Sequence, residues 1–220
     1  MLPQAVFFDL DGTLADTADD LAAPIHAMRA ARGLAPIAAS ELRPLTSMGA
    51  RGLIGKGLGF APGDAEYEPL RQEFMLHYEA GMLVRTRLFE GMPEVLDALD
   101  AAGIKWGVIS NKIERLVKPI VAGLGLADRS VCAIGGDTTA HAKPHPAPLL
   151  HGAALAGVQA ADCVYIGDDK RDIEAGHAAG MLTIAAAYGY CGNDLPPHEW
   201  GAHHLIDQPR ELVHLLLNRR

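Results

Sequence analysis

Short apolar runs recur along the chain, and most of them are bounded by glycine, aspartate or serine. These runs have the length of β-strands but lack the strict apolar–polar alternation of a strand with one face in water. Strands that are buried on both faces are typical of parallel sheets, so the pattern predicts a parallel β-sheet. The predicted strands are residues 5–8, 106–110, 131–135, 163–167 and 182–186.

Segments with helical periodicity fill the intervals between the later strands. The segment at residues 93–102 begins with a proline, which suits the first turn of a helix, and places Val95, Leu96 and Leu99 on one face. Alternation of strand and helix at this spacing is typical of right-handed βαβ units. We therefore predict an α/β fold, a Rossmann-like parallel sheet with helices on both faces. The other helices predicted here are residues 115–124, 147–156 and 171–179.

One interval is too long for a single crossover between strands. From Phe8 to Trp106 the chain runs for almost one hundred residues, whereas a βαβ unit takes about thirty. Three segments with helical patterns lie inside this interval, at residues 17–32, 41–57 and 66–81. The pattern therefore predicts an inserted helical module. The predicted division is a core domain of residues 1–15 and 87–220 and an insert of residues 16–86.

The composition limits the compartments and partners to be considered. The 220 residues are 49% hydrophobic, which is enough to bury a sizeable core. A net charge of −8 disfavours binding to nucleic acids and to anionic membranes. No apolar run reaches the roughly 20 residues of a membrane span, and the first residues lack the basic region of a signal peptide. Since three widely spaced cysteines also fit a reducing compartment, we expect a cytoplasmic protein without a nucleic-acid or membrane partner.

The first predicted strand ends in the motif Asp9-Leu10-Asp11-Gly12-Thr13. In open parallel sheets, ligands bind at the carboxyl ends of the strands, so both carboxylates lie where chemistry is expected. Alternation along an extended backbone places Asp9 and Asp11 on the same side. Two carboxylates at such a short distance repel each other unless a cation or a shared proton lies between them. Because Mg²⁺ prefers oxygen ligands, the motif predicts a magnesium site.

The later strands also end in polar groups. The second core strand leads into a hydroxyl group and turn amides, which suit anionic oxygens, and a lysine stands between a later loop and a helix start. The strand at residues 163–167 runs into two adjacent aspartates, with a third one helical turn later. Each of these groups alone could be structural, but all fall at strand carboxyl ends, so we expect them to converge on one site. They are Ser110, Asn111, Lys143, Asp168, Asp169 and Asp172.

This ordered set of groups resembles the four motifs of the haloacid dehalogenase-like phosphohydrolases. The resemblance covers essentially the whole chain and implies that the insert is the helical cap of that family. Within the family, the chain is similar to phosphoglycolate phosphatases and looks closest to a branch that dephosphorylates N-acetylmuramic acid 6-phosphate. The four motifs are Asp9-Leu10-Asp11-Gly12-Thr13, Ser110, Lys143 and Gly167-Asp168-Asp169-x-x-Asp172. The segments that resemble the second branch are residues 48–51, 88–92, 188–190 and 200–202.

The resemblance implies phosphoryl transfer through a covalent aspartyl-phosphate, with Asp9 as the nucleophile. It implies Mg²⁺ ligands from the Asp9 carboxylate, the backbone carbonyl of Asp11 and the Asp168 carboxylate. Asp169 or Asp172 would occupy the outer metal shell. Asp11 would protonate the leaving alcohol and then activate the water that hydrolyses the intermediate. The activity implied by these roles is that of a Mg²⁺-dependent phosphatase.

The same resemblance implies that Ser110, Asn111 and Lys143 hold the phosphoryl oxygens, and it makes Ser110 and Lys143 part of the catalytic set. Because such a core recognises only a phosphate, the insert is expected to select the substrate. Gly49 and Arg51 are candidates for this selection, since Arg51 beside a tight turn could bind a substrate carboxylate. We expect a small phosphorylated metabolite such as 2-phosphoglycolate as the substrate, and either a monomer or a homodimer.

Several alternatives stay open at this point. N-acetylmuramic acid 6-phosphate is the alternative substrate. A phosphosugar mutase also keeps the second aspartate of the first motif, and only the resemblance at Thr13 favours a phosphatase. A non-catalytic protein that captures phosphorylated ligands would share the fold, although every catalytic position is occupied here. Asp11 argues against a haloacid dehalogenase, which needs no second acid, and against a transport ATPase, which has threonine at that position.

Overall fold

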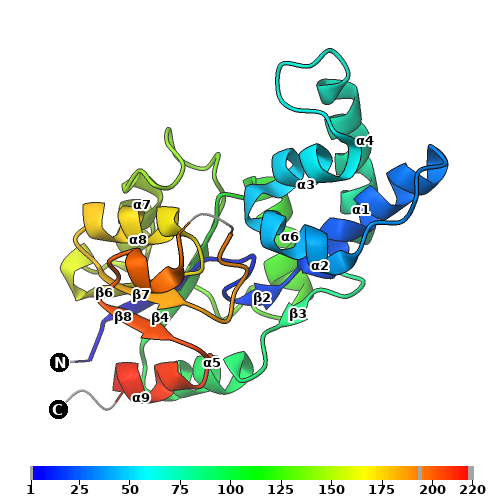
Figure 1. Ribbon diagram of the computed structural model, residues 1–220. Helices are drawn as coiled ribbons and strands as arrows, with labels where there is room; N and C mark the ends of the chain where they lie inside the picture. The colour runs from blue at the N-terminus through cyan, green and yellow to red at the C-terminus, as the bar shows by residue number, and fades with distance from the viewer. Residues whose placement is uncertain (1, 193–194, 218–220) are drawn as a thin grey trace.

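In the computed structural model, the described part of the chain (residues 2–192 and 195–217) forms a sheet of six parallel strands and a small antiparallel pair (Figure 1). The strand order of the large sheet is β5-β4-β1-β6-β7-β8. The predicted α/β fold with a parallel sheet is therefore confirmed. The six strands are β1 (Ala5–Phe8), β4 (Lys105–Ile109), β5 (Ala133–Ile134), β6 (Cys163–Gly167), β7 (Leu182–Ala186) and β8 (His204–Ile206).

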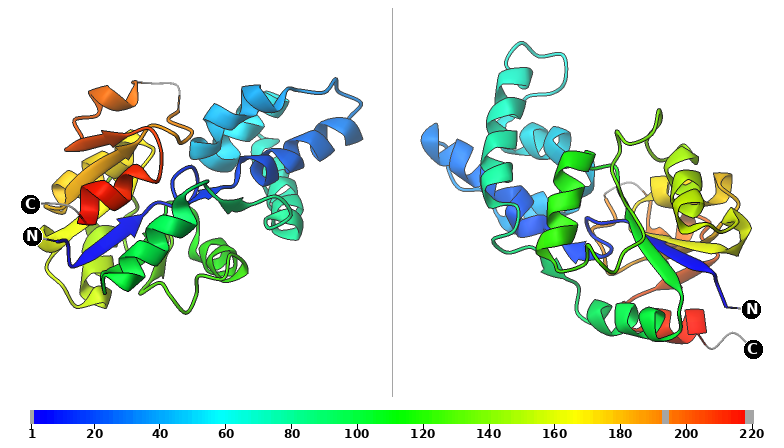
Figure 2. Two further views of the ribbon diagram at one scale, coloured as in Figure 1. Left: turned by 90° about the horizontal axis from the view of Figure 1, so that it is seen from below. Right: turned by 180° about the vertical axis from the view of Figure 1, so that it is seen from behind.

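Helices cover both faces of this sheet (Figure 2). They are α5 (Met92–Ala101), α6 (Glu114–Gly123) and α9 (Glu211–Leu217) on one face, and α7 (Ala147–Ala156) and α8 (Lys170–Ala178) on the other. Side chains alternate along β1, so that Val6 and Phe8 pack against the first group and Ala5 and Phe7 against the second. Burial on both faces explains why this strand is an uninterrupted apolar run.

Two elements near the C-terminus, β8 and α9, lie outside the predicted set. β8 has only three residues and joins the sheet by pairing with β7, so its own sequence is too short to carry a periodic signal. In α9, Leu212 and Leu216 are completely buried against the sheet. The predicted strand at residues 131–135 is also shorter in the structure, where only the two residues of β5 pair with β4.

Between β1 and β4 the chain forms a group of helices with a hydrophobic cluster of its own. Apart from Leu116 of α6, the buried members of this cluster come from the helices themselves. No helix within the described residues combines the length and apolar character that a membrane span needs. The helices are α1 (Ala18–Ala31), α2 (Ala39–Leu42), the 3₁₀ helix η1 (Arg43–Met48), α3 (Gly49–Leu58) and α4 (Tyr67–Gly81).

The prediction of one continuous helix at residues 41–57 is wrong. The structure divides this segment into the end of α2, the 3₁₀ helix η1 and α3. Pro44 has no N–H group to continue the hydrogen bonding of α2. Gly49 has φ = 59°, in the left-handed region, and turns the chain between η1 and α3. The apolar spacing continues through both breaks, which is why the periodicity alone does not show them.

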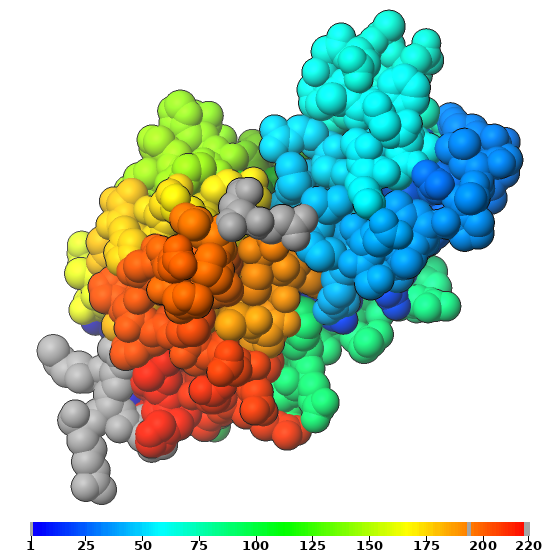
Figure 3. Space-filling view, in the orientation of Figure 1, coloured from blue at the N-terminus to red at the C-terminus, as the bar shows by residue number. Residues whose placement is uncertain are grey.

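Two linkers join the helical group to the sheet. They pair as the short antiparallel strands β2 (Ala15–Asp16) and β3 (Arg87–Leu88). Asp20 in the first turn of α1 accepts hydrogen bonds from the backbone N–H groups of Arg85 and Thr86 at 2.8–3.0 Å, and so ties the start of α1 to the second linker. In Figure 3 the helices form a lobe beside the body that contains the sheet. The division into a core and an insert at residues 16–86 stays a prediction, and β2 and β3 lie at its two boundaries.

Candidate active site

The polar groups predicted at the strand ends lie around the carboxyl edge of β1 and β6. Asp9 follows β1 directly and donates its backbone N–H to Ile166 of β6. Asp168 follows β6 directly. The chain then turns at Gly12, where φ is 87° and where a Cβ atom would overlap the Asp168 carboxylate. Glycine is required here for both reasons, and it lets the first motif approach the last one closely.

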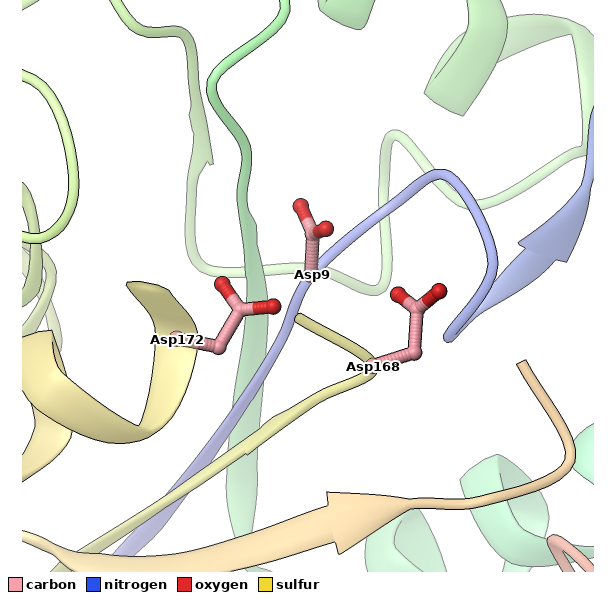
Figure 4. Close-up of side chains that lie close together, drawn as sticks. All are labelled: Asp9, Asp168 and Asp172. Carbon is pink, nitrogen blue, oxygen red and sulfur yellow. The ribbon is translucent and has the colours of Figure 1, made fainter. Parts of the chain in front are cut away.

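Three carboxylates form a buried cluster at this edge (Figure 4). Asp9 and Asp168 come from the two strand ends, and Asp172 comes from the first turn of α8. One oxygen of each residue lies within 4.8 Å of an oxygen of the other two. Asp169 begins α8 as its N-cap in a reciprocal capping box with Asp172, so the helix start holds the Asp172 side chain in place.

The environment of these carboxylates opposes their negative charge. Burial is the main cause that raises the pKa of Asp168 well above its usual value, and the charges of Asp9 and Asp172 raise it further. Hydrogen bonds from the Thr13 hydroxyl and the Tyr190 backbone N–H, both at 2.8 Å, partly offset this effect. Burial also raises the pKa of Asp172. The cluster therefore has an unfavourable charge that invites a cation.

Within the described residues, Lys143 is the positively charged side chain that lies inside this cluster. Its Nζ atom lies 2.6 Å from Asp172 Oδ1 and 3.0 Å from Asp9 Oδ1, and it also donates to the Tyr165 hydroxyl at 2.8 Å. Burial alone would lower the pKa of Lys143, but the charges of Asp172 and Asp9 outweigh it and leave that pKa raised. The ammonium group therefore stays charged between two carboxylates.

The donor set fits a divalent metal ion. Three carboxylates against one ammonium group leave two negative charges, which a divalent cation would balance. Asp9 Oδ1 is buried and has no well-aligned hydrogen bond within the described residues, although Lys143 is near. Oxygen ligands suit a hard cation such as Mg²⁺. Of the two residues predicted for the outer metal shell, Asp172 belongs to the cluster, whereas Asp169 is paired with Arg171 at 2.8 Å.

Two of the groups predicted to bind phosphate, Ser110 and Asn111, lie in the loop after β4, and the third, Lys143, lies in the loop between β5 and α7. Ser110 is buried, and its Oγ accepts a hydrogen bond from the backbone N–H of Lys112. The Asn111 side chain exchanges two hydrogen bonds of 2.9 Å with the backbone of Lys143 and thereby positions that lysine. Within the described residues, the backbone N–H groups of Asn111 and Leu10 donate to no acceptor. Free amides of this kind can bind anionic oxygens.

The Asp11 side chain has different partners from the Asp9 side chain. Its two oxygens accept hydrogen bonds from Lys112 Nζ at 2.9 and 2.8 Å, and Oδ1 also accepts one from the Thr17 hydroxyl at 2.6 Å. Lys112 is 8% exposed, so this is a buried ion pair. The predicted roles of Asp11, as an acid and base and as a metal ligand through its carbonyl, stay predictions.

A cavity of about 270 Å³ lies above these groups and extends to the helical insert. Gly49 lines it, whereas Arg51 is exposed and is not among the lining residues. The two residues predicted to select the substrate are therefore separated by the structure. The core side of the cavity contains Asp9, Asp11, Ser110, Asn111, Lys112, Ile113, Leu116, Lys143, Asp169, Arg171 and Asp172. The insert contributes Leu21, residues 46–50, Arg71, Phe74, Met75 and Tyr78.

Comparison with known proteins agrees with this arrangement. The sequence profile of the family described as haloacid dehalogenase-like hydrolase matches residues 6–186, which include every polar group around the cavity edge of the sheet. The chain belongs to this family. A haloacid dehalogenase-like hydrolase with a buried aspartate cluster has the donor set of a divalent-metal site.

The relatives of this hydrolase have two different names. It is 43% identical over 213 residues to an N-acetylmuramic acid 6-phosphate phosphatase of Pseudomonas aeruginosa, covering 97% of this chain and 94% of that one. It is 46% identical over 211 residues to a phosphoglycolate phosphatase of Xanthomonas campestris, covering 96% and 95%. A crystal structure described as a predicted phosphoglycolate phosphatase from Haemophilus somnus has a TM-score of 0.83 at 25% identity, covering 96% and 97%.

Three residues of this hydrolase site lie outside the sequence predictions. Lys112 directly follows the predicted pair Ser110–Asn111, so its position in the chain was an available signal. Tyr78 reads as an ordinary apolar position of helix α4, and Arg171 as an exposed helix residue. Arg171 in fact donates to the backbone carbonyl of Ser47 at 2.9 Å and so connects α8 to the insert. Tyr78 in turn lies against Lys112. The positions of Tyr78 and Arg171 in the site therefore depend on how the insert packs against the sheet.

Proposed function

We propose that this hydrolase is a Mg²⁺-dependent phosphatase that hydrolyses a small metabolite phosphate such as 2-phosphoglycolate. The observation that carries the proposal is the buried cluster of Asp9, Asp168 and Asp172 with Lys143, at the floor of a cavity that reaches the insert. The names of the relatives from Xanthomonas and Pseudomonas support a phosphomonoester as the substrate. Residues 16–86 would act as the cap that selects it.

In the first step, a carboxylate oxygen of Asp9 attacks the phosphorus atom, and the bond between phosphorus and the ester oxygen breaks. The product is an aspartyl-phosphate, and Asp11 gives a proton to the leaving oxygen. Asp11 lies two residues beyond Asp9, directly before the turn at Gly12, and lines the same cavity, which suits a group that acts on the same substrate.

In the second step, a water molecule attacks the phosphorus atom and Asp11 takes its proton. The bond from phosphorus to Asp9 breaks, and inorganic phosphate and the Asp9 carboxylate are formed. Ser110, the backbone N–H groups of Leu10 and Asn111, and Lys143 would hold the phosphoryl oxygens through both steps.

Asp9 and Asp168, with the backbone carbonyl of Asp11, would hold the Mg²⁺ ion, and Asp172 would orient its surroundings. When bound, this ion supplies positive charge that reduces the repulsion between a carboxylate nucleophile and a phosphate dianion. Asp172 accepts hydrogen bonds from Lys143 and from the Asp169 backbone N–H, and these bonds would hold its carboxylate in place beside that ion.

One observation favours N-acetylmuramic acid 6-phosphate as a second candidate substrate. The wall formed by the insert is largely apolar, with Leu21, Phe74 and Met75 among its side chains, and Arg71 is partly exposed at the cavity. An N-acylated sugar phosphate has an apolar acetyl group and a carboxylate far from its ester. Such a substrate would fill the cavity further than a two-carbon ester does.

The test is phosphate release from 2-phosphoglycolate and N-acetylmuramic acid 6-phosphate, measured in parallel with Mg²⁺ and with EDTA. We expect release that depends on Mg²⁺ and a value of kcat/KM at least about tenfold higher for one ester, because a cap contact to one charged group is worth about this factor. Release without Mg²⁺ would contradict the metal assignment. No release from either ester or from an aryl phosphate would contradict phosphatase activity and favour a mutase or a binding protein.

A further inference from the structure

Lys112 is a buried cation that the mechanism above does not use. It lies between the core and the insert: its Nζ atom pairs with both oxygens of Asp11, and it lies 4.9 Å from the centre of the Tyr78 ring in α4. Both side chains line the cavity, and Tyr78 is 1% exposed. An ammonium group on the face of an aromatic ring is attracted by the ring, so Tyr78 helps to hold Lys112 in place.

Lys112 and Tyr78 both have unused hydrogen-bonding capacity. An ammonium group has three N–H donors, and Lys112 donates to the two oxygens of Asp11 while its Nζ atom also lies close to the Tyr78 hydroxyl. The Tyr78 hydroxyl is buried and forms no well-aligned hydrogen bond with any described residue, although Lys112 lies near it. A buried hydroxyl without a partner is unfavourable. These two groups lie side by side in the cavity lining, where the core meets the insert, and therefore favour a ligand that supplies oxygen acceptors.

The other cations around the cavity are less suited to this task. Lys143 pairs with Asp172 and Asp9, and in the proposed mechanism it holds the phosphoryl oxygens. The Arg171 side chain is 40% exposed and already holds Asp169. The Arg71 side chain is 46% exposed and pairs with Glu68. Among the described lining residues, Lys112 is thus the buried cation with a donor to spare.

The position of Lys112 limits where the substrate's acceptor lies. A group that protonates the leaving oxygen has to approach it to about 3 Å. Since Lys112 Nζ is 2.8 Å from Asp11 Oδ2, the ester oxygen lies within roughly 6 Å of the ammonium group. A carboxylate attached directly to the esterified carbon has its oxygens about 3 Å from the ester oxygen, given ordinary bond lengths. Such a carboxylate reaches Lys112, whereas one several bonds further along points toward the rim.

We infer that Lys112 and Tyr78 form a carboxylate subsite that selects phosphate esters with a carboxylate attached directly to the esterified carbon, the class of 2-phosphoglycolate. The ammonium group then stands between Asp11 and the substrate carboxylate, as Lys143 stands between Asp9 and Asp172. The Tyr78 hydroxyl donates to the second carboxylate oxygen. This inference rests on the proposed function, because it concerns the substrate of the same site.

The experiment compares two esters of similar size, 2-phosphoglycolate and 2-hydroxyethyl phosphate, which lacks the carboxylate. The readout is the ratio of their kcat/KM values with Mg²⁺, because a general loss of catalysis cancels in this ratio. We expect the wild-type protein to prefer 2-phosphoglycolate. Lys112→Met should lower the ratio about 10- to 100-fold, and Tyr78→Phe about 3- to 10-fold, as expected for a charged and a single hydrogen bond to a carboxylate.

The matched control is Arg115→Met. Arg115 is also a cation on the core that pairs with a residue of α4, Glu79, but it is exposed and outside the cavity lining, so the ratio should not change. Tyr78→Phe removes one oxygen atom and keeps the ring in the hydrophobic cluster, so it gives an answer even if Lys112→Met is unstable. Thermal unfolding of each variant verifies that it is folded.

Two results would overturn the inference and leave phosphatase activity standing. One is a wild-type protein that hydrolyses the two esters equally well. The other is a Lys112→Met variant in which both rates fall by the same factor, because Lys112 then acts only on Asp11. A wild-type protein that releases no phosphate from either ester or from an aryl phosphate would overturn the proposed function and this inference together.

Discussion

Single residues carry the charge balance of this site. Asp9, Asp168 and Asp172 are all buried, and Lys143 alone neutralises one of their three charges within the described cluster. Removing one carboxylate therefore has two separate effects. It can remove a chemical role, and it relieves repulsion among the groups that remain. The loss of a chemical role appears in the reaction rate, whereas the relief of repulsion appears in the melting temperature. The two measurements together therefore distinguish a nucleophile from a residue that only stabilises the fold.

At Asp9, we predict that Asp9→Asn lowers Mg²⁺-dependent phosphate release by at least about 10³-fold, because an amide does not replace the attacking carboxylate. The metal-free variant should unfold at the same temperature as the wild-type protein or a higher one, since a buried negative charge is lost. Steady-state kinetics and thermal unfolding measure the two effects. Asp128→Asn, at an exposed position, is the control for both. A variant with more than a tenth of the wild-type rate would contradict the nucleophile assignment.

At the scale of elements, the site depends on how helix starts and loops meet. The first turn of α8 supplies Asp172 to the cluster and Arg171 to the insert, where Arg171 binds the backbone carbonyl of Ser47 in η1. Five residues of the segment from η1 into α3, residues 46–50, line the cavity. Arg171 therefore fixes one wall of the cavity relative to the strand ends.

We predict that Arg171→Gln raises KM about three- to tenfold and changes kcat less, because the η1 wall then has to be ordered when the substrate binds. Steady-state kinetics with the better of the two esters separates the two constants. Lys170→Gln is the matched control, since Lys170 is the neighbouring exposed cation and pairs within α8 with Glu174. An unchanged KM, or an equal rise in the control, would show that this bridge does not shape the cavity.

At the scale of the whole molecule, the buried carboxylates connect stability with pH and with metal. The pKa values of Asp168 and Asp172 are raised in the folded protein, mainly by burial. The folded state therefore binds more protons than the unfolded state, and the free energy of unfolding falls as pH rises above about 4, where these groups ionise in the unfolded chain. A bound divalent cation opposes this loss, because it favours the ionised carboxylates.

We therefore predict that this cluster lowers the melting temperature of the metal-free protein at pH 8 relative to pH 5. Mg²⁺ at about one hundred times its Kd should raise the melting temperature by about 5–10 °C at pH 8 and by less at pH 5. Thermal unfolding with EDTA and with Mg²⁺ at constant ionic strength measures both shifts. Asp168→Asn should lose most of the Mg²⁺ effect. An equal Mg²⁺ shift at both pH values, retained in this variant, would place the ion elsewhere.

The sequence by itself determined the sheet and the position of its chemistry. Runs such as 5–8 and 163–167 are apolar throughout because both faces of each strand are buried, and this pattern is local. In a parallel sheet the carboxyl ends lie at one edge, so the polar residues after β1, β4, β5 and β6 had to meet there. Their order along the chain was therefore sufficient to predict the cluster that contains Asp9, Asp168 and Lys143.

Only the tertiary structure decided which side chains reach the cavity from the insert. Periodicity joined residues 41–57 into one helix, but Pro44 and Gly49 divide them, and Gly49 lines the cavity while Arg51 does not. The contact of Lys112 with Tyr78 likewise joins segments that are far apart in the chain. Local pattern shows which face of a helix is apolar, and the packing of that helix against the rest of the molecule sets what its polar side chains meet.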